Sequence, residues 1–496
     1  MTTNLKQSAL AGVKWATVSQ VGQQAIAFVT TLLLVRLLAP ADFGLLNMAL
    51  IVIGFVRIFR DLGTGSAIVQ RQDLSDELLS SLFWVNLVFG LLMTLLLAAA
   101  APAVSWFYQE PRVTPILRVL SLIFFISCLS ILQQALLQRA LAFDRLARLE
   151  LAAGVIGSGV GIGAALLGGG VWSLVYQALA GTVATTLLLW LTSSWYPRRL
   201  FSWTEVRAVS SYSLNLTGFN VFNYFERNLD NILVGRFLGA QALGYYALAY
   251  RLMLYPIQNI SHMLTRVMFP SFARIQDDDE RFRRVYLQVT GALALVTFPM
   301  YCGLVATRTP LILTIFGPQW RPVIPLILVL GFVGMVQSVA IPAGAIFRAK
   351  GRTDWQLRWG LAITFPFALA FLIGLRWGVV GVATAYAVTS AVLIYPTFAI
   401  PFRLIGLRVS ELCAPLWRPF ACSALMFAGV AGLEATLPAT WGQQTRLAIL
   451  VATGIALYLA ASWLVNREQI CSLLETVGVR RRLARIGVGS WVAGRS

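Results

Sequence analysis

The chain contains 496 residues, of which 58% are hydrophobic and only 12% are charged. This apolar content exceeds what the core of a soluble protein would hold, so the composition excludes a mainly soluble fold and indicates a membrane protein. The formal net charge of +19 could reflect nucleic-acid binding. However, the basic residues occur in every second loop rather than on one face of a soluble domain, which argues against a nucleic-acid partner.

Apolar segments of about twenty residues, the length that crosses about 30 Å of hydrocarbon, recur from Ala11 to Val465. They are too long and too continuous for the alternating strands of a membrane barrel. Because backbone amides in lipid must be hydrogen-bonded within their own segment, we predict an all-α polytopic membrane protein of about fourteen transmembrane helices. The predicted spans are 11–35, 41–60, 80–103, 115–136, 150–169, 171–193, 209–233, 242–268, 285–306, 322–346, 357–376, 378–400, 417–437 and 444–465.

The loops between these spans differ in charge. Lys and Arg are concentrated in alternate loops, such as 139–148, 274–284 and 348–352, whereas intervening links such as 168–170 are nearly uncharged. Cytoplasmic loops of membrane proteins are enriched in Lys and Arg, so we predict that both chain ends lie in the cytoplasm. The first span carries Lys14 and is too long for the apolar part of a signal peptide, so we expect it to be retained.

Cysteine and histidine are sparse. The five cysteines show no CxxC spacing, and His262 is the only histidine. The sequence therefore predicts no disulfide, no metal site, no cofactor and no Ser–His–Asp catalytic triad. The acidic run 277–280 stands beside several arginines, and we interpret it as a solvated segment at the membrane surface rather than a metal site.

The chain also resembles itself at an offset of about 200 residues, which rises to about 210 in a second block. The aligned pairs are Arg36 and Arg236, Gly44 and Gly244, Ala49 and Ala249, Ala135 and Ala345, Asp144 and Asp354, and Arg148 and Arg358. Leu-rich helices produce such matches by chance, so coincidence is the alternative. A true repeat predicts two pseudo-symmetric six-helix lobes related by an axis along the membrane normal.

This repeat predicts four regions along the chain. The N-terminal lobe covers residues 1–200 and the C-terminal lobe covers 201–405. Two extra C-terminal helices occupy 406–466, and a basic tail follows at 467–496. The tail is either an amphipathic stretch that binds an anionic inner leaflet or an ordinary cytoplasmic tail.

Polar residues in three predicted spans form stripes at helical spacing. Such residues are costly in a membrane unless they face a partner or a watery cavity, so a stripe indicates a lumen. The seventh span carries Asn215, Asn220, Asn223, Glu226, Arg227, Asp230 and Asn231 within an arc of about 160°. The eighth span carries Arg251, Tyr255, Asn259, His262 and Arg266 on one face, with Pro256 beside them as a candidate for a kink. The first span carries the weaker stripe Lys14, Thr17, Gln20 and Gln24.

These stripes together predict a substrate-binding lumen. Guanidinium, amide and aromatic groups suit an anionic substrate that carries sugars, because arginine binds phosphate oxygens in pairs and amides bond hydroxyl groups. The alternative is that the polar residues only hold helices together, with nearby carboxylates neutralising Arg227 or Arg251. Proton coupling through Glu226, Asp230 or His262 is a further hypothesis.

Six segments, taken in order along the chain, match the pattern of a known family. They are RLLAPADFGLLNMA from Arg36, DLGTGSAIVQRQDLS from Asp61, LLQRALAFDRLA from Leu136, GRFLGAQALGYYALAYRL from Gly235, FPSFARIQDD from Phe269 and FGPQWRPVIPLILVL from Phe316. With these segments the chain resembles the polysaccharide transporter (Wzx-type flippase) family of the multidrug/oligosaccharidyl-lipid/polysaccharide exporter superfamily.

The resemblance implies a fourteen-helix, two-lobed flippase in the bacterial inner membrane. Such a protein passes undecaprenyl-diphosphate-linked oligosaccharide units to the outer leaflet by alternating access, for the synthesis of exopolysaccharide, capsule or lipopolysaccharide O-antigen. The implied partners are this lipid-linked substrate, membrane lipids, and a polysaccharide polymerase with chain-length or export proteins. The family has no motif from which site residues can be carried over.

Other functions are alternatives. A cation-coupled multidrug antiporter of the same superfamily would share the architecture, although cationic drugs favour an acidic lumen. A flippase for the peptidoglycan lipid precursor would carry a related cargo. An enzyme is not expected, because the predicted outer loops are short and poor in acidic and histidine residues.

Overall fold

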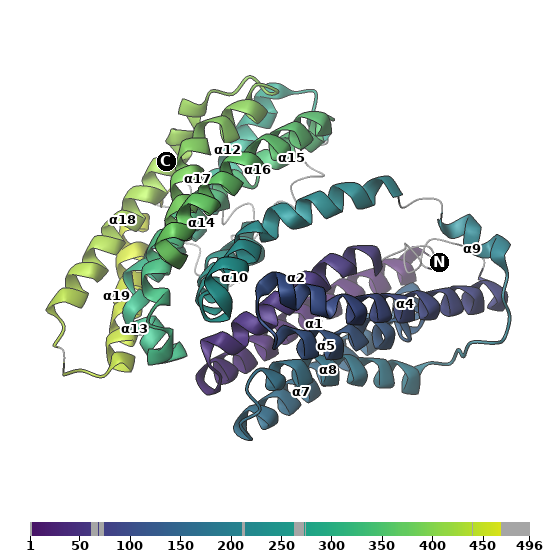
Figure 1. Ribbon diagram of the computed structural model, residues 1–496. Coiled ribbons are helices and arrows are strands. Elements are labelled where there is room, and N and C mark those ends of the chain that lie inside the picture. The colour runs from purple at the N-terminus through teal and green to yellow at the C-terminus, as the bar shows by residue number, and fades with distance from the viewer. Residues whose placement is uncertain are drawn as a thin grey trace. The chain divides into compact units, whose positions relative to one another are not determined.

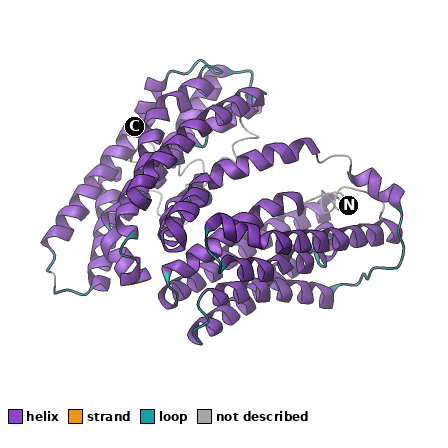
Figure 2. Cartoon of the chain, in the orientation of Figure 1, coloured by secondary structure: helices purple, strands orange, loops and turns teal. Residues whose placement is uncertain are grey.

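The structure of the protein is a computed structural model that describes residues 2–60, 68, 74–210, 214–261, 272, 274–438 and 440–467. All regular elements in these ranges are helical (Figure 2). Among the described residues, eleven helical segments are long and apolar enough to cross a membrane, or twelve if the pair 113–128 and 131–139, bent by 42°, is one span. The prediction of an all-α polytopic membrane protein is confirmed.

Contacts between Cα atoms divide the chain into two units, of which the first is Met1–Ala247. Its helices are α1 (Thr2–Leu37), α2 (Pro40–Arg60), α4 (Asp76–Tyr108), α5 (Val113–Cys128), α6 (Ile131–Arg139), α7 (Phe143–Leu166), α8 (Val171–Thr192), α9 (Trp203–Ser210) and most of α10 (Leu214–Pro256). Within this unit α7 packs against α1 and α8, while α5 packs against α4 and α8 (Figure 1). The short helix α9 is an element that the sequence analysis does not predict.

The second unit is Leu248–Ser496. After the end of α10 it contains a π-helix (Ile257–Ser261), α12 (Asp279–Ala306), α13 (Arg308–Leu311), α14 (Val323–Ala340), α15 (Ala343–Ala349), α16 (Thr353–Gly374), α17 (Gly378–Phe402), α18 (Cys413–Thr436) and α19 (Gln443–Val465). Short π and 3-10 turns at Ile312–Phe316, Pro318–Trp320, Leu375–Trp377 and Val409–Leu412 connect several of them.

The packing order of the first unit recurs in the second. α14 packs against α12 and α17 as α5 packs against α4 and α8, and α16 pairs with α17 as α7 pairs with α8. This recurrence supports the internal repeat. The predicted lobe boundary after residue 200 follows from the repeat and stays a prediction, whereas the contacts group residues 201–247 with the first unit.

The aligned glycines of the repeat contact each other's helices in the first unit. Gly44 lies on α2, and Gly244 lies on α10 beyond a non-helical break at Gly239. A Cβ atom on Gly44 would overlap the carbonyl oxygen of Ala240, and one on Gly244 would overlap that of Pro40. Each glycine thus packs against the residue that precedes the other glycine by four positions. Such a reciprocal contact is expected where two symmetry-related helices cross closely at small residues.

Several helices begin earlier than the predicted spans, because polar side chains cap them. The hydroxyl of Ser75 accepts a hydrogen bond from the backbone N–H of Leu78 (3.1 Å), so α4 begins before the apolar run. In the same way, the carboxylate of Asp278 accepts from the N–H of Arg281 (3.0 Å) at the start of α12. Hydropathy marks where a helix meets lipid, whereas the cap decides where the helix starts.

Two segments exceed the length of one membrane crossing. Val221–Ile260 has 40 residues and Thr353–Phe402 has 50, whereas one crossing needs about twenty. Each contains a glycine with positive φ, Gly239 at 82° and Gly378 at 68°, where regular helix breaks. The loop predicted between spans 209–233 and 242–268 is therefore mostly helical. Fourteen crossings require that both long segments count twice and that the bent pair 113–128 and 131–139 is one span, and this number remains a prediction.

Candidate functional site

The polar stripe predicted for the seventh span lies on the first part of α10. Asn223 and Glu226 are half-buried, and Arg227 is exposed. Asp230, which lies one turn beyond Glu226, is only 4% exposed. The side chain of Asn220 lies outside the described part of the structure. The stripe therefore passes from an accessible end to a buried end.

Asp230 is the centre of a buried hydrogen-bond network. Its Oδ2 accepts from the Tyr246 hydroxyl (2.9 Å), and its Oδ1 accepts from the backbone N–H (2.7 Å) and the side-chain amide (2.9 Å) of Asn231. The amide of Asn47, on α2, donates in turn to Asn231 (3.3 Å). A buried carboxylate is costly unless it is hydrogen-bonded. These contacts join α10 across the break at Gly239 and tie it to α2.

The stripe predicted for the eighth span begins on the last turns of α10. Arg251 and Tyr255 are exposed, one turn apart, and the amide of Asn259 donates to the Tyr255 carbonyl (2.8 Å). The helix changes from α to π after Pro256, in place of a simple kink, because proline has no N–H for the α pattern. His262 and Arg266 lie outside the described residues.

The stripe predicted for the first span lies on an exposed face of α1. Lys14, Gln20 and Gln24 are all exposed. Another face of the same helix carries Ser19 and Gln23, which make polar contacts with α7. There, the hydroxyl of Ser19 and the amide of Gln23 both donate to Oε2 of Glu150 on α7, each at 2.8 Å.

The Ser19, Gln23 and Glu150 cluster is what the sequence analysis missed. Ser19 and Gln23 are one turn apart and also bond each other (2.9 Å). Glu150 is the only acidic residue in the predicted span 150–169, and that lone carboxylate was the available signal. Its partners, however, are 127 and 131 residues away, so no local spacing reveals them.

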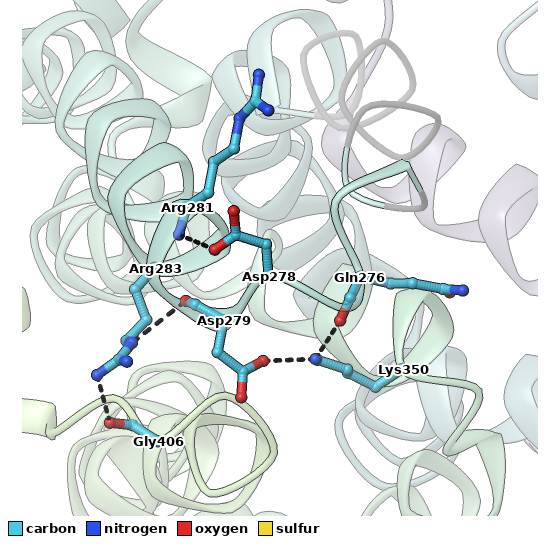
Figure 3. Close-up of polar contacts among 7 residues, drawn as sticks. All are labelled: Gln276, Asp278, Asp279, Arg281, Arg283, Lys350 and Gly406. Atoms are coloured by element: carbon cyan, nitrogen blue, oxygen red, sulfur yellow. Dashed lines mark hydrogen bonds and ion pairs between the residues drawn. The ribbon is translucent and has the colours of Figure 1, made fainter.

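The acidic run 277–280 takes part in a polar network that joins three predicted cytoplasmic loops (Figure 3). Lys350, whose side chain is 17% exposed, donates to Oδ1 of Asp279 (2.6 Å) and to the backbone carbonyl of Gln276. Arg283 donates to the carbonyls of Asp279 (3.2 Å) and Gly406 (3.3 Å). The run thus binds basic side chains, and within the described residues no group of three or more His, Cys, Asp or Glu could hold a metal ion.

Comparison with known proteins gives a consistent result. A sequence model of the family described as polysaccharide biosynthesis protein matches residues 33–325. The chain is 30% identical over 462 residues to the teichuronic acid biosynthesis protein TuaB of Bacillus subtilis (strain 168), covering 92% of this chain and 95% of that protein. It is 27% identical over 428 residues to the lipopolysaccharide biosynthesis protein WzxC of Escherichia coli (strain K12), covering 85% and 86%.

The fold is also shared with a solved structure. The lipid II flippase MurJ, in an inward closed conformation, superposes with a TM-score of 0.71 at 13% sequence identity. The superposition covers 92% of this chain and 99% of that structure. At this low identity the likeness concerns the arrangement of the helices alone.

Proposed function

We infer that the protein is a flippase for undecaprenyl-diphosphate-linked oligosaccharides. The inference starts from the family, because the chain belongs to the polysaccharide biosynthesis protein family. The protein would move these units from the inner to the outer leaflet of the bacterial inner membrane, where they enter exopolysaccharide, capsule or O-antigen. The observation that carries this proposal is the near full-length similarity to proteins named for teichuronic acid and lipopolysaccharide biosynthesis. The chain itself is a multi-pass membrane protein.

The physical need for such a protein is clear. A diphosphate cannot cross hydrocarbon without compensation of its charge, so a carrier must supply a polar and cationic path while the prenyl chain stays in lipid. In our proposal the exposed Arg251 binds the diphosphate, since a guanidinium group matches phosphate oxygens in pairs. Tyr255 and Asn259 follow on the same helix and would bind adjacent polar groups. Alternating access is the proposed transport cycle.

The same proposal places both chain ends in the cytoplasm, on the side of the basic loops. The cargo is then loaded from the inner leaflet, where it is synthesised, and released to a polymerase with chain-length or export proteins outside. The role is transport rather than catalysis.

Deletion of the gene tests this function. We expect loss of surface polysaccharide and accumulation of undecaprenyl-linked oligosaccharides that remain inaccessible to reagents added outside the cell. Reintroduction of the gene should reverse both effects. Unchanged polysaccharide together with a changed tolerance to cationic drugs would indicate an antiporter, and loss of viability with arrested peptidoglycan synthesis would indicate the peptidoglycan precursor as cargo.

Replacement of Arg251 tests the proposed diphosphate contact. Arg251→Ala should abolish polysaccharide export at unchanged protein level, whereas Arg251→Lys should retain part of it, because the charge stays but paired binding is lost. Arg376→Ala, an exposed arginine in the turn between α16 and α17, is the matched control and should export normally. Normal export by Arg251→Ala would exclude the assigned role.

A further inference from the structure

An open cavity of about 570 Å³ with polar groups in its lining lies in the first unit, between parts of α1, α2, α7, α8 and the bend from α5 to α6. Its lining on α8 runs from Leu174 to Thr186, which is about 18 Å along the helix axis. The polar residues that decide its chemistry are Gln23, Ser130, Gln134, Glu150, Gln177 and Thr182. The predicted stripes contain none of them.

Two structural features form this cavity. Small residues hold α7 and α8 close together, since a Cβ atom on Gly157 would lie 2.9 Å from the carbonyl oxygen of Gln177 and 3.0 Å from Cα of Gly181. The bend of 42° between α5 and α6 then turns the chain away beside them. The hydroxyl of Thr186 donates to the carbonyl of Ile126 (3.1 Å), which satisfies a backbone group next to the bend.

The charge of the lining excludes an anion as the ligand. Among the described residues, no Lys or Arg lines the cavity, and Glu150 is the only charged residue in its lining. A phosphate would therefore meet a carboxylate without a compensating cation, which is unfavourable in a membrane. The diphosphate of the cargo must bind elsewhere, which is consistent with the separate assignment of Arg251.

The hydroxyls of Ser130 and Thr182 donate to backbone carbonyls, but two amides and part of a carboxylate in the lining are available to a ligand. Among the described residues, no partner bonds the side-chain amides of Gln134 and Gln177. Glu150 uses Oε2 for Ser19 and Gln23, and a carboxylate has further lone pairs to offer. Each amide supplies both donors and acceptors. A sugar hydroxyl also both donates and accepts, so it can pair with amide and carboxylate groups alike.

The size of the cavity also fits this chemistry. Pockets for small organic ligands measure about 300–1,000 Å³, and an elongated cavity of about 570 Å³ lies within that range. A single cation would fill only a small part of such a space. We propose that this cavity binds sugar residues of the lipid-linked oligosaccharide, separately from the diphosphate. The assignment rests on the proposed flippase function and specifies where its cargo's sugars bind.

Two glutamine exchanges test the assignment. Gln134→Leu and Gln177→Leu keep the side-chain size but remove the amide, and neither amide is needed within the described fold. The probes are undecaprenyl-linked oligosaccharides extracted from the gene-deletion strain, and undecaprenyl diphosphate without sugar. Binding of both to the full-length protein in lipid nanodiscs is measured for wild type and variants.

The two probes should respond differently. Each exchange should weaken binding of the oligosaccharide lipid by about five- to tenfold, the effect of one lost hydrogen bond, and leave binding of undecaprenyl diphosphate unchanged. Gln356→Leu, in the first turn of α16, is the matched control and should alter neither. Arg251→Ala should weaken both.

Each remaining outcome rejects the assignment in a distinct way. Unchanged oligosaccharide binding in both variants, or an effect only on pH or cation dependence of transport, would show that the cavity does not hold sugar, while the flippase function would stand. An equal loss for both probes would likewise exclude a sugar-specific site. If the wild-type protein binds neither lipid, the proposed function itself is wrong, and the assignment is wrong with it. Thermal unfolding of each variant checks that the fold is intact.

Discussion

The two halves of the internal repeat carry the same residue type where their helices cross. They carry different residue types at the positions that line the polar cavity. Gly44 and Gly244 are matched, and each contacts the helix of the other. At the offset of about 210 found for the second block, Glu150 and Gln134 are instead matched by Gly360 and Gly344. The carboxylate and amide that line the polar cavity of the first unit thus have no counterpart in the second half.

The second unit has a cavity of another character. It measures about 430 Å³ and lies among α12, α13, α18 and α19, with Met300, Leu304, Met426, Val430 and Leu450 in its lining. A close helix crossing allows only small residues, so both halves keep glycine there. Cavity-lining positions carry no such steric limit, so the two halves of the repeat can differ there, as Glu150 and Gln134 differ from Gly360 and Gly344. The apolar cavity also involves α18 and α19, which lie outside the repeat.

A large effect is expected at the shared crossing of α2 and α10. Gly44→Ala and Gly244→Ala should each lower the free energy of unfolding by about 3 kcal/mol or more, because the added methyl group meets backbone rather than a movable side chain. Thermal unfolding in detergent, followed by tryptophan fluorescence, measures this loss. Gly360→Ala is the matched control, since outside the neighbouring backbone of its own helix nothing lies within 4 Å of its Cβ position. A strong effect of one crossing glycine without the other would contradict a reciprocal contact.

An intermediate effect is expected at the polar network of the second unit around Lys350 and Asp279. Lys350→Ala should cost about 1–2 kcal/mol of unfolding free energy, because it removes the hydrogen bonds to Asp279 and to the Gln276 carbonyl from a mostly buried lysine. Ala140 is the aligned residue in the first half, and Ala140→Lys should not raise the free energy of unfolding. Arg284→Ala, which removes the exposed pair with Glu280, is the control with little effect. If Lys350→Ala is as stable as the wild type, the hydrogen bonds of Lys350 do not stabilise the fold.

The smallest effect is expected in the loop before α5, which is compared below with the segment before α14. Glu110 forms a paired contact with Arg112 (2.8 and 2.9 Å), and hydrogen bonding from that arginine lowers the pKa of Glu110. The pair therefore stabilises the fold above the ordinary pKa of the carboxyl group, and this contribution is lost as the pH falls through the lowered pKa. Glu110→Gln should cost at most about 1 kcal/mol at neutral pH and nothing in acid, as measured by thermal unfolding at both pH values.

The segment before α14 provides the contrast. Trp320, which stands 210 residues after Glu110 and also precedes a helix of its unit, is fully buried, and Trp320→Ala should cost about 3–5 kcal/mol with no dependence on pH. A Glu110→Gln effect as large as that of Trp320→Ala would mean that the exposed pair is part of the packed core, contrary to its accessible arginine.

The fold was largely predictable from the sequence, because the membrane imposes a simple rule on apolar length. The helix ends were less predictable, as Ser75 and Asp278 show, since capping extends helices beyond the apolar run. The candidate site was predictable only in part. Arg251 and Tyr255 lie one turn apart on α10 and are both exposed. Their role in binding remains a prediction.

Asp230 shows why spacing alone is insufficient for a site. Periodicity placed it on the same stripe as Glu226, but its partners, Tyr246 and Asn231, depend on how α10 continues beyond Gly239. Glu150 shows the same limit more strongly, because its partners Ser19 and Gln23 come from another helix.

The sequence by itself determined that this chain crosses the membrane many times, which family it resembles, and that its halves share glycines at matching positions. Those properties depend on residue type and local spacing, which hydrocarbon and helix geometry convert directly into structure. Only the tertiary structure decided that Gly44 and Gly244 meet each other's helices, and that one half forms an open cavity lined by polar groups. Such features join residues more than a hundred positions apart, and only the packing of the helices brings them together.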